Sequence, residues 1–462
     1  MAHDTSFLFD VLDDGQVSVG DSDRDEHAAD WSTSPDEAVR PDAVVWPEST
    51  DDVSRVLAAA SDRGVPVTPY AAGTGLEGNA VPVREGVSMD LTRMDAVRDV
   101  RPADRQVDVE PGVIGDAVDE AVAKHGLFFP PLPSSGAIST VGGMIATDAS
   151  GMGTVKYGEV ADWVLELEAV LADGTVITAG SKAAKTSAGY NLADLLVGSE
   201  GTLGVVTRAT LELAGRPQQK RGGRAVFADL DDAASAIADV IRSGVDVAKL
   251  ELMGPVAADV ATDYVGSDLP ASPMLFLEFH ADHHVDAEVD FCRSVLDAHD
   301  PVSVDIGDGD DAADLWELRR KMAYAVDEYD PVLEPLHPGD VTVPISDLPE
   351  MVRFAKSRGR AADLQVPCFG HAGDGNLHYE ILVDPDDPEM VARGEDVYAA
   401  IVERAIELGG TATGEHGVGR GKRAFLDAEH GVGVDVMRTV KDALDPAGIL
   451  NPGKIFPDEA SE

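Results

Sequence analysis

Apolar residues in the first half of the chain recur in two periods, which together predict a mixed α and β fold. Apolar side chains at i, i+3, i+4 and i+7 after Ser49 predict a helix that ends at Gly64. Alternating apolar residues on either side of Asp173-Gly174 predict a β-hairpin. Residues 1–40 are acidic and weakly patterned, so we expect a loosely attached leader before a first domain at 41–215.

The pattern changes after Gly215-Arg216-Pro217, and we place a domain boundary near residue 216. Beyond it, the order of elements is βαββαβ, which is typical of a ferredoxin-like unit. We expect its strands at 224–229, 247–253, 274–280 and 302–307, and its helices at 231–243 and 285–299. Further helices are expected at 310–328, 388–408 and 433–444. The expected fold class is α+β, with a cap domain and a C-terminal helical segment in the second part.

Acidic residues dominate the charge of the chain. It carries 85 Asp and Glu against 36 Lys and Arg, a net charge of −49, yet 44% of its residues are hydrophobic. This composition predicts a folded protein with an acidic surface rather than a disordered one. Because salt screens the self-repulsion of such a surface, we expect a halophilic protein. The charge also argues against nucleic acid or an anionic membrane surface as a partner.

Cysteine content and hydropathy limit the compartment. Cys292 and Cys368 are too few for a disulfide framework or for an iron–sulfur cluster held by this chain, which normally needs four thiolates. The N-terminus lacks the basic and apolar regions of a signal peptide, and no run of 18 apolar residues occurs. We therefore expect no transmembrane segment and a cytoplasmic location, with peripheral membrane association left open.

Two stretches of small residues are candidates for contact with a large ligand. In the stretch 71–79, the three glycines match G-x-G-x-x-G, but a proline-containing, strand-like run follows where a Rossmann fold needs a helix. A nest of backbone N–H groups between strands can still hold a diphosphate, and an ordinary turn is the alternative. The stretch 140–151 is also small and glycine-rich, which indicates backbone packed against a large flat ligand.

The stretch 369–378 holds the clearest candidate chemistry. His371 and His378 flank Gly-Asp-Gly-Asn, and strand-like flanks predict a hairpin that brings the two imidazoles together. A catalytic metal site usually has three protein ligands. Further along the chain, Glu415 and His416 stand next to each other in a glycine-rich segment and offer candidates for the third ligand. Histidines that only form hydrogen bonds in a turn-rich core are the alternative.

Arg319 lies on the apolar face of the expected helix 310–328. Burial of an unpaired charge is costly, so this guanidinium needs an anionic partner. An internal Asp or Glu is one candidate. A substrate carboxylate, which the guanidinium fork matches with two hydrogen bonds, is the other.

Taken together and in this order, the motifs over residues 41–456 resemble the FAD-linked oxidase family, with its vanillyl-alcohol-oxidase type of FAD domain. The chain looks most like D-lactate dehydrogenase (cytochrome) and the glycolate oxidase D subunit, with D-2-hydroxyglutarate dehydrogenase as a third relative. The resemblance implies a two-part, PCMH-type FAD-binding domain at 41–215. It also implies an FAD-linked oxidase C-terminal domain, carrying the cap and the metal site, at 216–456.

The resemblance implies FAD as cofactor. No histidine or cysteine lies in the loop 71–79, so the flavin is expected to be non-covalent. In that loop, Ala71 and Ala72 replace small residues that are often glycine in the family. The residues that match the family's cofactor contacts are Ala71, Ala72, Gly73, Thr74, Gly75, Gly78, Asn79, Pro133, Ser134, Thr140, Gly142, Gly143, Ala146, Thr147, Ala149, Val206, Asn451 and Lys454.

The resemblance also assigns roles to the candidate site. The family's divalent-metal ligands fall on His371, His378 and Glu415. Zinc is the first expectation, with manganese and iron as alternatives. The general base falls on His416, the carboxylate-binding arginine on Arg319, and a polar residue near the substrate on Asn376. Ala323 and Pro338 stand where the hydroxyglutarate enzymes have a threonine and a lysine, which favours a monocarboxylate.

These matches predict an FAD-dependent dehydrogenase that oxidises a D-2-hydroxy monocarboxylic acid, D-lactate first, to the 2-keto acid by hydride transfer to flavin N5. An external quinone, cytochrome or iron–sulfur protein must then accept the electrons. A glycolate oxidase catalytic subunit and, more remotely, a D-2-hydroxyglutarate dehydrogenase are alternatives. A flavin-free metal-dependent hydrolase and a flavoprotein that serves only as an assembly or electron-transfer partner are alternatives from other classes. A homodimer is left open.

Overall fold

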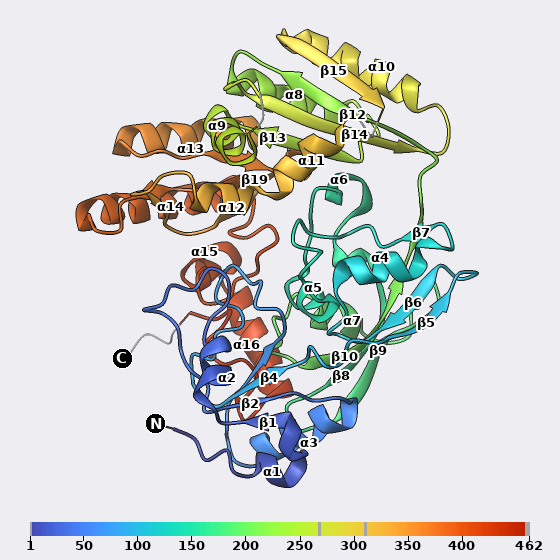
Figure 1. The fold of residues 1–462 in the computed structure, drawn as a ribbon, viewed down its shortest axis with the longest axis vertical. Coiled ribbons are helices and arrows are strands. Elements are labelled where there is room, and N and C mark those ends of the chain that lie inside the picture. Colours follow the sequence, from blue (N-terminus) through green and yellow to red (C-terminus); the bar gives the residue numbers. More distant parts are fainter. Residues whose placement is uncertain (1, 267–268, 309–311, 458–462) are drawn as a thin grey trace. The chain divides into compact units, whose positions relative to one another are not determined.

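The computed structural model describes residues 2–266, 269–308 and 312–457, which form two compact units (Figure 1). Unit 1 contains the chain up to Ser150, residues 159–216 and the chain from Glu415 onwards. Unit 2 contains residues 151–158 and 217–414. The segment after Glu415, which the sequence grouped with the second domain, therefore packs with the first unit. Among the helices of the described chain, none has both the length and the apolar character to cross a membrane.

Unit 1 is built on two sheets. One has the order β1-β2-β4-β3, in which β4 runs parallel to both β2 and β3. The other is antiparallel, with the order β5-β6-β10-β8-β9. The strands of the first sheet are β1 (Val17–Ser18), β2 (Ala43–Val45), β3 (Val67–Tyr70) and β4 (Val87–Asp90). Those of the second are β5 (Val97–Arg101), β6 (Gln106–Val109), β8 (Val164–Val170), β9 (Val176–Gly180) and β10 (Val205–Glu212). The short strands β7 (Leu127–Phe128) and β11 (Ala214–Gly215) pair with each other.

Helices of unit 1 follow the local signals in the sequence. The expected helix after Ser49 is confirmed as α3 (Thr50–Ser61), and the Ser49 side chain caps it by accepting from the Asp52 N–H. The hairpin at Asp173-Gly174 is also confirmed, because β8 and β9 pair up to this turn. The other helices are α1 (Leu8–Val11), α2 (Asp21–Glu26), α4 (Gly115–Ala123), α5 (Val141–Thr147), α7 (Leu192–Leu196), α15 (Leu426–His430) and α16 (Gly433–Leu444).

Residues before position 41 are not loosely attached, which corrects the expectation for this stretch. Phe7, Leu8, Leu12 and Val17 are buried in one core cluster with residues of β2 and α3. Val17 also pairs with Val45, which adds β1 to the edge of the first sheet. The apolar run 7–12 is a short local signal, and the sequence alone does not show that it packs against β2 and α3.

Unit 2 contains one seven-stranded sheet with the order β15-β12-β14-β13-β18-β19-β17. Its first four strands have the antiparallel order of a ferredoxin-like unit, which confirms that prediction. The strands are β12 (Gln219–Val226), β13 (Lys249–Met253), β14 (Met274–Ala281), β15 (Ser303–Asp308), β17 (Gly339–Thr342), β18 (Cys368–Gly370) and β19 (Asn376–Tyr379). A separate pair joins β16 (Glu334–Pro335) to β20 (Leu382–Val383).

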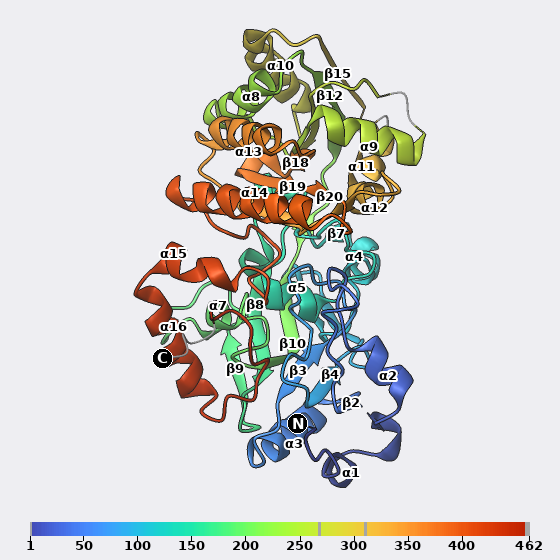
Figure 2. The ribbon, with the colours of Figure 1, turned by 90° about the vertical axis from the view of Figure 1, so that its left-hand side faces the viewer.

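Helices cover both faces of this sheet (Figure 2). One face carries α8 (Leu230–Arg242), α10 (Val285–Leu296), α13 (Leu348–Ala362) and α14 (Pro388–Glu407). The other carries α9 (Pro255–Val265), α11 (Ala313–Arg320) and α12 (Met322–Asp327). The sequence predicted α8, α10 and α14 but neither α9 nor α13. It predicted one helix over 310–328, where the structure has α11 and α12, and residues 310 and 311 lie outside the described part. Unit 2 also includes α6 (Thr154–Tyr157).

The C-terminal segment of unit 1 returns to the first sheet. The Val67 N–H donates to the Ile449 carbonyl, and the Asn451 N–H donates to the Val67 carbonyl, each over 2.8 Å. This pairing attaches the C-terminal segment to the outer edge of β3, the strand that leads into the glycine-rich loop 71–79. Asn451 and the residues after it are thereby brought to that loop.

Candidate functional site

The hairpin of unit 2 brings two histidines together. Strands β18 and β19 pair in antiparallel register, which confirms the predicted hairpin, and Gly375 takes a φ of 89° in the turn between them. The ring centroids of His371 and His378 lie 5.1 Å apart, with the planes at 86°. A ring nitrogen of one lies within 4.8 Å of a ring nitrogen of the other. Both rings are more than nine-tenths buried.

Hydrogen bonds orient both imidazoles. Nδ1 of His371 donates to Oε1 of Glu251 over 2.7 Å, and Nδ1 of His378 donates to the Gly339 carbonyl over 3.4 Å. A proton on Nδ1 leaves the lone pair on Nε2, which is the nitrogen that can bind a metal. Metal-binding histidines usually donate their other N–H to a carboxylate or a backbone carbonyl in this way. The donor set of the hairpin therefore fits a divalent transition metal.

Glu251, in the middle of β13, is a buried residue of the site that could not be assigned from the sequence. It has no exposed surface, and its Oε2 accepts a hydrogen bond of 2.7 Å from Nε of Arg319. Burial alone would raise the pKa of Glu251, but the charges of His371 and Arg319 hold it below its ordinary value. The signal in the sequence was a single acid between apolar residues of a strand, Lys-Leu-Glu-Leu-Met.

Arg319 keeps part of its guanidinium unused. Its partner in unit 2 is an internal acid, one of the two candidates that the sequence left open. Its Nη2, however, is buried and has no hydrogen-bond partner among the described residues. The ring of Phe369 lies 5.0 Å from the guanidinium carbon. An unfilled buried donor is costly, so this atom points to an anionic or carbonyl ligand.

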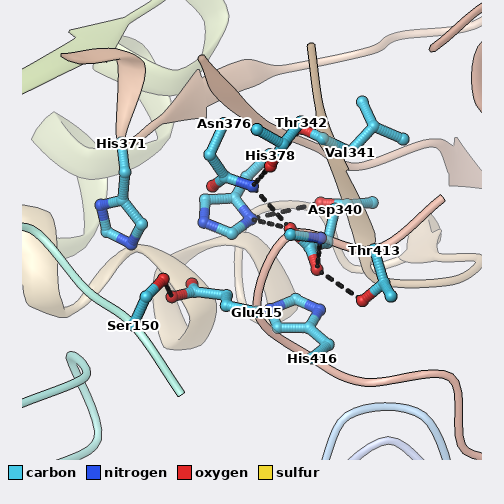
Figure 3. Close-up of polar contacts among 12 residues, drawn as sticks. Ser150, Asp340, Val341, Thr342, His371, Asn376, His378, Thr413, Glu415 and His416 are labelled. Carbon is cyan, nitrogen blue, oxygen red and sulfur yellow. Dashed lines mark hydrogen bonds and ion pairs between the residues drawn. The ribbon is translucent and has the colours of Figure 1, made fainter. Parts of the chain in front are cut away.

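Asp340, in β17, organises the rest of the site (Figure 3). Its Oδ1 accepts a hydrogen bond of 2.7 Å from Nδ2 of Asn376. Its Oδ2 accepts from the Thr413 hydroxyl over 3.0 Å and from the Gly414 N–H over 2.8 Å. Because Nδ2 of Asn376 is engaged, the amide is oriented, and its Oδ1 is buried with no hydrogen-bond partner among the described residues. Asn376 therefore offers an oriented acceptor.

Gly414 admits no side chain. A Cβ at this position would lie 2.2 Å from Nδ2 of Asn376 and 2.5 Å from Oγ1 of Thr342. The close approach lets the Gly414 N–H reach Asp340. The chain passes from unit 2 to unit 1 between Gly414 and Glu415.

Glu415 and His416 belong to unit 1. Oε2 of Glu415 accepts a hydrogen bond of 2.8 Å from the Ser150 hydroxyl (Figure 3). Nδ1 of His416 lies 3.9 Å from Oε1 of Glu77, and the same oxygen lies 3.2 Å from Nζ of the fully buried Lys422. Glu77 is part of the glycine-rich loop, so His416 lies beside that loop.

The glycine-rich loop of unit 1 is shaped by crowding. It follows β3 and leads to β4 without a helix. A Rossmann fold would need a helix at this place, so the loop is not a Rossmann loop, as the sequence predicted. A Cβ at Gly75 would lie 2.8 Å from Oδ1 of Asn79, and one at Gly78 would lie 2.6 Å from Cγ of Arg420. Gly73 and Gly78 also take positive φ, of 64° and 68°. The glycines therefore let the loop pack closely against neighbouring side chains, and the backbone N–H groups of such a loop can hold a diphosphate.

Glu200 joins the predicted cofactor segments inside unit 1. Its carboxylate accepts from Nδ2 of Asn79 over 2.6 Å and from two backbone N–H groups, at 418 and 419. Its carbonyl accepts from Nδ2 of Asn451 over 2.7 Å, and its N–H donates to the Ala146 carbonyl of α5 over 2.7 Å. The loop, the α5 segment and the C-terminal segment therefore meet around one buried residue, whose role the sequence did not reveal.

The remaining predicted cofactor residues lie in the same unit. The Thr74 hydroxyl is 3.2 Å from that of Ser139, which connects the loop to the second small-residue stretch. Thr140 caps α5 by accepting from the Gly143 N–H. Nζ of Lys454 donates to Oδ1 of Asn451 over 3.2 Å, and burial lowers the pKa of Lys454 to about 7. Val206 lies in β10, opposite Ala169 of β8.

Comparisons with known proteins agree with this architecture. The family model described as FAD binding domain matches residues 41–180, and the model described as FAD linked oxidases, C-terminal domain, matches residues 216–455. The glycolate oxidase subunit GlcD of Bacillus subtilis is 37% identical over 453 residues, which cover 96% of this chain and 95% of that protein. The mitochondrial D-lactate dehydrogenase (cytochrome) of Arabidopsis thaliana is 35% identical over 90% of this chain and 74% of its own length.

Among solved structures, p-cresol methylhydroxylase with substrate bound aligns with a TM-score of 0.80 at 17% sequence identity, covering 98% of this chain and 96% of that one. A likeness at this identity shows the fold alone, and it confirms the predicted PCMH-type FAD-binding architecture. The two family models and the relatives above 30% identity show more than the fold. The chain belongs to the FAD-linked oxidase family, as an oxidoreductase related to D-lactate dehydrogenase (cytochrome) and glycolate oxidase subunit GlcD.

Proposed function

We propose that this chain is an FAD-dependent dehydrogenase of D-2-hydroxy monocarboxylic acids, with D-lactate as the first candidate substrate. The observation that carries the proposal is the shared carboxylate of Glu251, which accepts from Arg319 on one oxygen and from His371 on the other. It joins a guanidinium with an unused buried donor to an imidazole oriented for a metal. A carboxylate and a hydroxyl on neighbouring carbons of one substrate match these two groups.

Arg319 is assigned to the substrate carboxylate. Its Nε is held by Glu251, so the orientation of the guanidinium is set before any substrate binds. Its Nη2 then supplies the donor toward the substrate, and Oδ1 of Asn376 supplies an acceptor. Orientation of the groups in advance lowers the entropic cost of the reaction.

The metal ligands are assigned to His371, His378 and Glu415. The hydrogen-bonded Nδ1 atoms of the two histidines support the assignment, as does the covalent link from Glu415 to Gly414, which Asp340 anchors. A bound divalent ion supplies a Lewis acid that lowers the pKa of the substrate hydroxyl. His416 is assigned as the base that takes the hydroxyl proton, and its Nδ1 lies 3.9 Å from the carboxylate of Glu77, whose negative charge favours a proton on the ring.

The cofactor is assigned to the surface formed by loop 71–79, the stretch 133–149, Val206, and the returning Asn451 and Lys454. The glycine crowding in the loop and the network around Glu200 support this assignment. Bound FAD supplies a hydride acceptor. Membership of the FAD-linked oxidase family removes the flavin-free hydrolase as an alternative.

Glycolate is the second candidate substrate, and the GlcD relative supports it. Ala323 and Pro338 stand where a dicarboxylate enzyme needs polar contacts, which disfavours D-2-hydroxyglutarate. Reoxidation is assigned to an external quinone, cytochrome or iron–sulfur protein.

The net charge of −49 supports work in a salty cytoplasm. This adaptation to salt predicts that the melting temperature rises when the KCl concentration is increased to the molar range. A melting temperature that does not rise would contradict it.

Anaerobic bleaching of the flavin tests the proposal. The purified protein is mixed with D-lactate, L-lactate, glycolate or D-2-hydroxyglutarate, and the loss of flavin absorbance is followed in stopped flow. D-lactate is expected to bleach the flavin fastest, glycolate more slowly, and the other two negligibly. Equal rates with D- and L-lactate, or no bleaching with either D-lactate or glycolate, would overturn it.

A further inference from the structure

The N-terminal segment of unit 1 is fastened to the glycine-rich loop. The Trp31 N–H donates to the Gly73 carbonyl over 2.9 Å, and Nη1 of Arg420 donates to the Glu37 carbonyl over 3.1 Å. The Val39 N–H donates to the Ala28 carbonyl over 2.9 Å, which closes the segment into a loop of its own. These bonds give residues 28–39 a fixed place against a ligand-binding loop, although the family model for the FAD domain begins only at residue 41.

Asp30 lies at the centre of this segment with one oxygen unused. Only 7% of the residue is exposed, and Oδ1 accepts a hydrogen bond of 2.6 Å from the Thr33 hydroxyl. Oδ2 is buried and makes no hydrogen bond of ordinary geometry with the described residues, although the Ala80 N–H is near enough to the carboxyl group to lower its pKa. A buried acceptor without a partner is costly, most of all on a charged group. The atom therefore calls for a donor from outside the chain.

The unused oxygen faces the backbone of the loop. A Cβ at Gly75 would lie 3.0 Å from Oδ2 of Asp30, so a side chain at position 75 would fill the space in front of it. Burial raises the pKa of Asp30, while the Thr33 hydroxyl, the Ala80 N–H and the charges of Lys454 and Arg420 act to lower it. The two cations offset only part of the cost of burying a carboxylate here.

We propose that Asp30 is a cofactor-binding residue, whose Oδ2 accepts a hydrogen bond from a sugar or sugar-alcohol hydroxyl of the FAD held by loop 71–79. The inference rests on the proposed function, because it needs FAD at that loop. A diphosphate oxygen would repel the carboxylate and has no proton to donate near neutral pH, whereas the hydroxyls on either side of the diphosphate are donors. Two sources share this chemistry, the ribityl chain on the flavin side and the ribose on the adenine side.

The test measures the dissociation constant for FAD of the full-length chain after removal of its flavin, followed by quenching of flavin fluorescence. Loss of a hydrogen bond to a charged group is expected to raise the constant about 10- to 100-fold in Asp30→Ala. Asp30→Asn retains an acceptor and is expected to lose less. The matched control is Asp52→Asn, which changes another buried acid of unit 1 that bonds Gln16 and lies in α3.

Titration with FMN separates the two hydroxyl sources. FMN retains the ribityl chain and lacks the ribose, so a loss for both flavins assigns the ribityl hydroxyl and a loss for FAD alone assigns the ribose. An unchanged constant for FAD in Asp30→Ala would overturn the inference, as would tighter binding of FAD in Asp30→Asn, which would show that the carboxylate only repels the diphosphate. Wild-type protein that binds no FAD would instead overturn the proposed function, so the two failures are distinguishable.

Discussion

Arg319 and His371 are joined through one buried carboxylate, because each donates to a different oxygen of Glu251 over 2.7 Å. The acid has no exposed surface and comes from the middle of a central strand, so it cannot move far. A group assigned to the substrate and a group assigned to the metal are therefore held in fixed relation.

Replacement of Glu251 tests its role as orienter. In Glu251→Gln only one oxygen remains, so the side chain can no longer accept from both Arg319 and His371. Loss of such an outer partner typically lowers metal affinity about 10- to 100-fold. Competition with a chelator measures the affinity, and the flavin content should stay at the wild-type level. Glu278→Gln is the matched control, since it changes another buried glutamate of the same sheet. Wild-type affinity in Glu251→Gln would show that the carboxylate does not orient the ligand.

Arg319→Lys separates the two functions of the guanidinium. Lysine can still pair with Glu251, but it lacks the second donor that Nη2 provides. We expect KM for D-lactate to rise about 10- to 100-fold, as for the loss of a charged hydrogen bond. The control is Arg320→Lys at the neighbouring exposed position. Steady-state kinetics that give an unchanged KM would mean that Glu251 is the only partner that Arg319 has.

The hairpin and the ferredoxin-like order could be read from the sequence, because both have local causes. Gly-Asp-Gly-Asn between two strand-like runs is a turn signal, and strand and helix periods alternate clearly after residue 216. Glu251 could not be assigned, because only the pairing of distant segments shows what a lone acid in an apolar strand contacts. The same holds for Glu200 and Asp340, which join segments far apart in the sequence.

The N-terminal segment was expected to be loose and is ordered, which is a second limit of prediction from the sequence. The segment is acidic and weakly patterned, and these two features indicated a loose leader. Phe7 and Leu8 nevertheless pack into the core, and Trp31 is bonded to the loop at Gly73. A few anchoring contacts suffice to order such a segment, and a short apolar run does not show in the sequence what it will pack against.

Gly414→Ala tests whether the close approach of the Gly414 backbone to the Asn376 side chain is needed for activity. The added Cβ would lie 2.2 Å from Nδ2 of Asn376, so either the chain or the amide must move. We expect turnover to fall at least about tenfold, because a small displacement of catalytic groups is enough for such a loss. A flavin content equal to that of the wild type would show that unit 1 still binds its cofactor. Gly433→Ala, where the nearest atom to the new Cβ is 3.6 Å away, is the control and should keep full activity. Wild-type turnover in Gly414→Ala would contradict the assigned site geometry.

The lowered pKa of Glu278 predicts that the free energy of unfolding depends on pH. Burial alone would raise its pKa, but His280 and Lys249 hold it at about 2, below the ordinary value of 4.5. The folded state therefore binds this proton more weakly than the unfolded chain. The stabilisation is complete above pH 4.5 and is lost as the pH falls toward about 2.

Urea unfolding of wild type and Glu278→Gln at several pH values measures this contribution. The difference in the free energy of unfolding should shrink as the pH falls from about 4.5 to about 3, below the range in which the neighbouring His280 titrates in the unfolded chain. Molar salt in all samples keeps the acidic protein soluble near its isoelectric point. A difference that remains constant over the whole range would show that Glu278 is not preferentially ionised in the folded state.

The most direct test of the central claim is anaerobic reduction of the flavin by D-lactate before and after removal of the metal with a chelator. If His371, His378 and Glu415 hold a catalytic divalent ion, the protein as purified should bleach rapidly. The chelated protein should keep its flavin but lose nearly all of the rate, and added zinc or manganese should restore it. Flavin reduction that proceeds at the same rate without the metal would contradict the account.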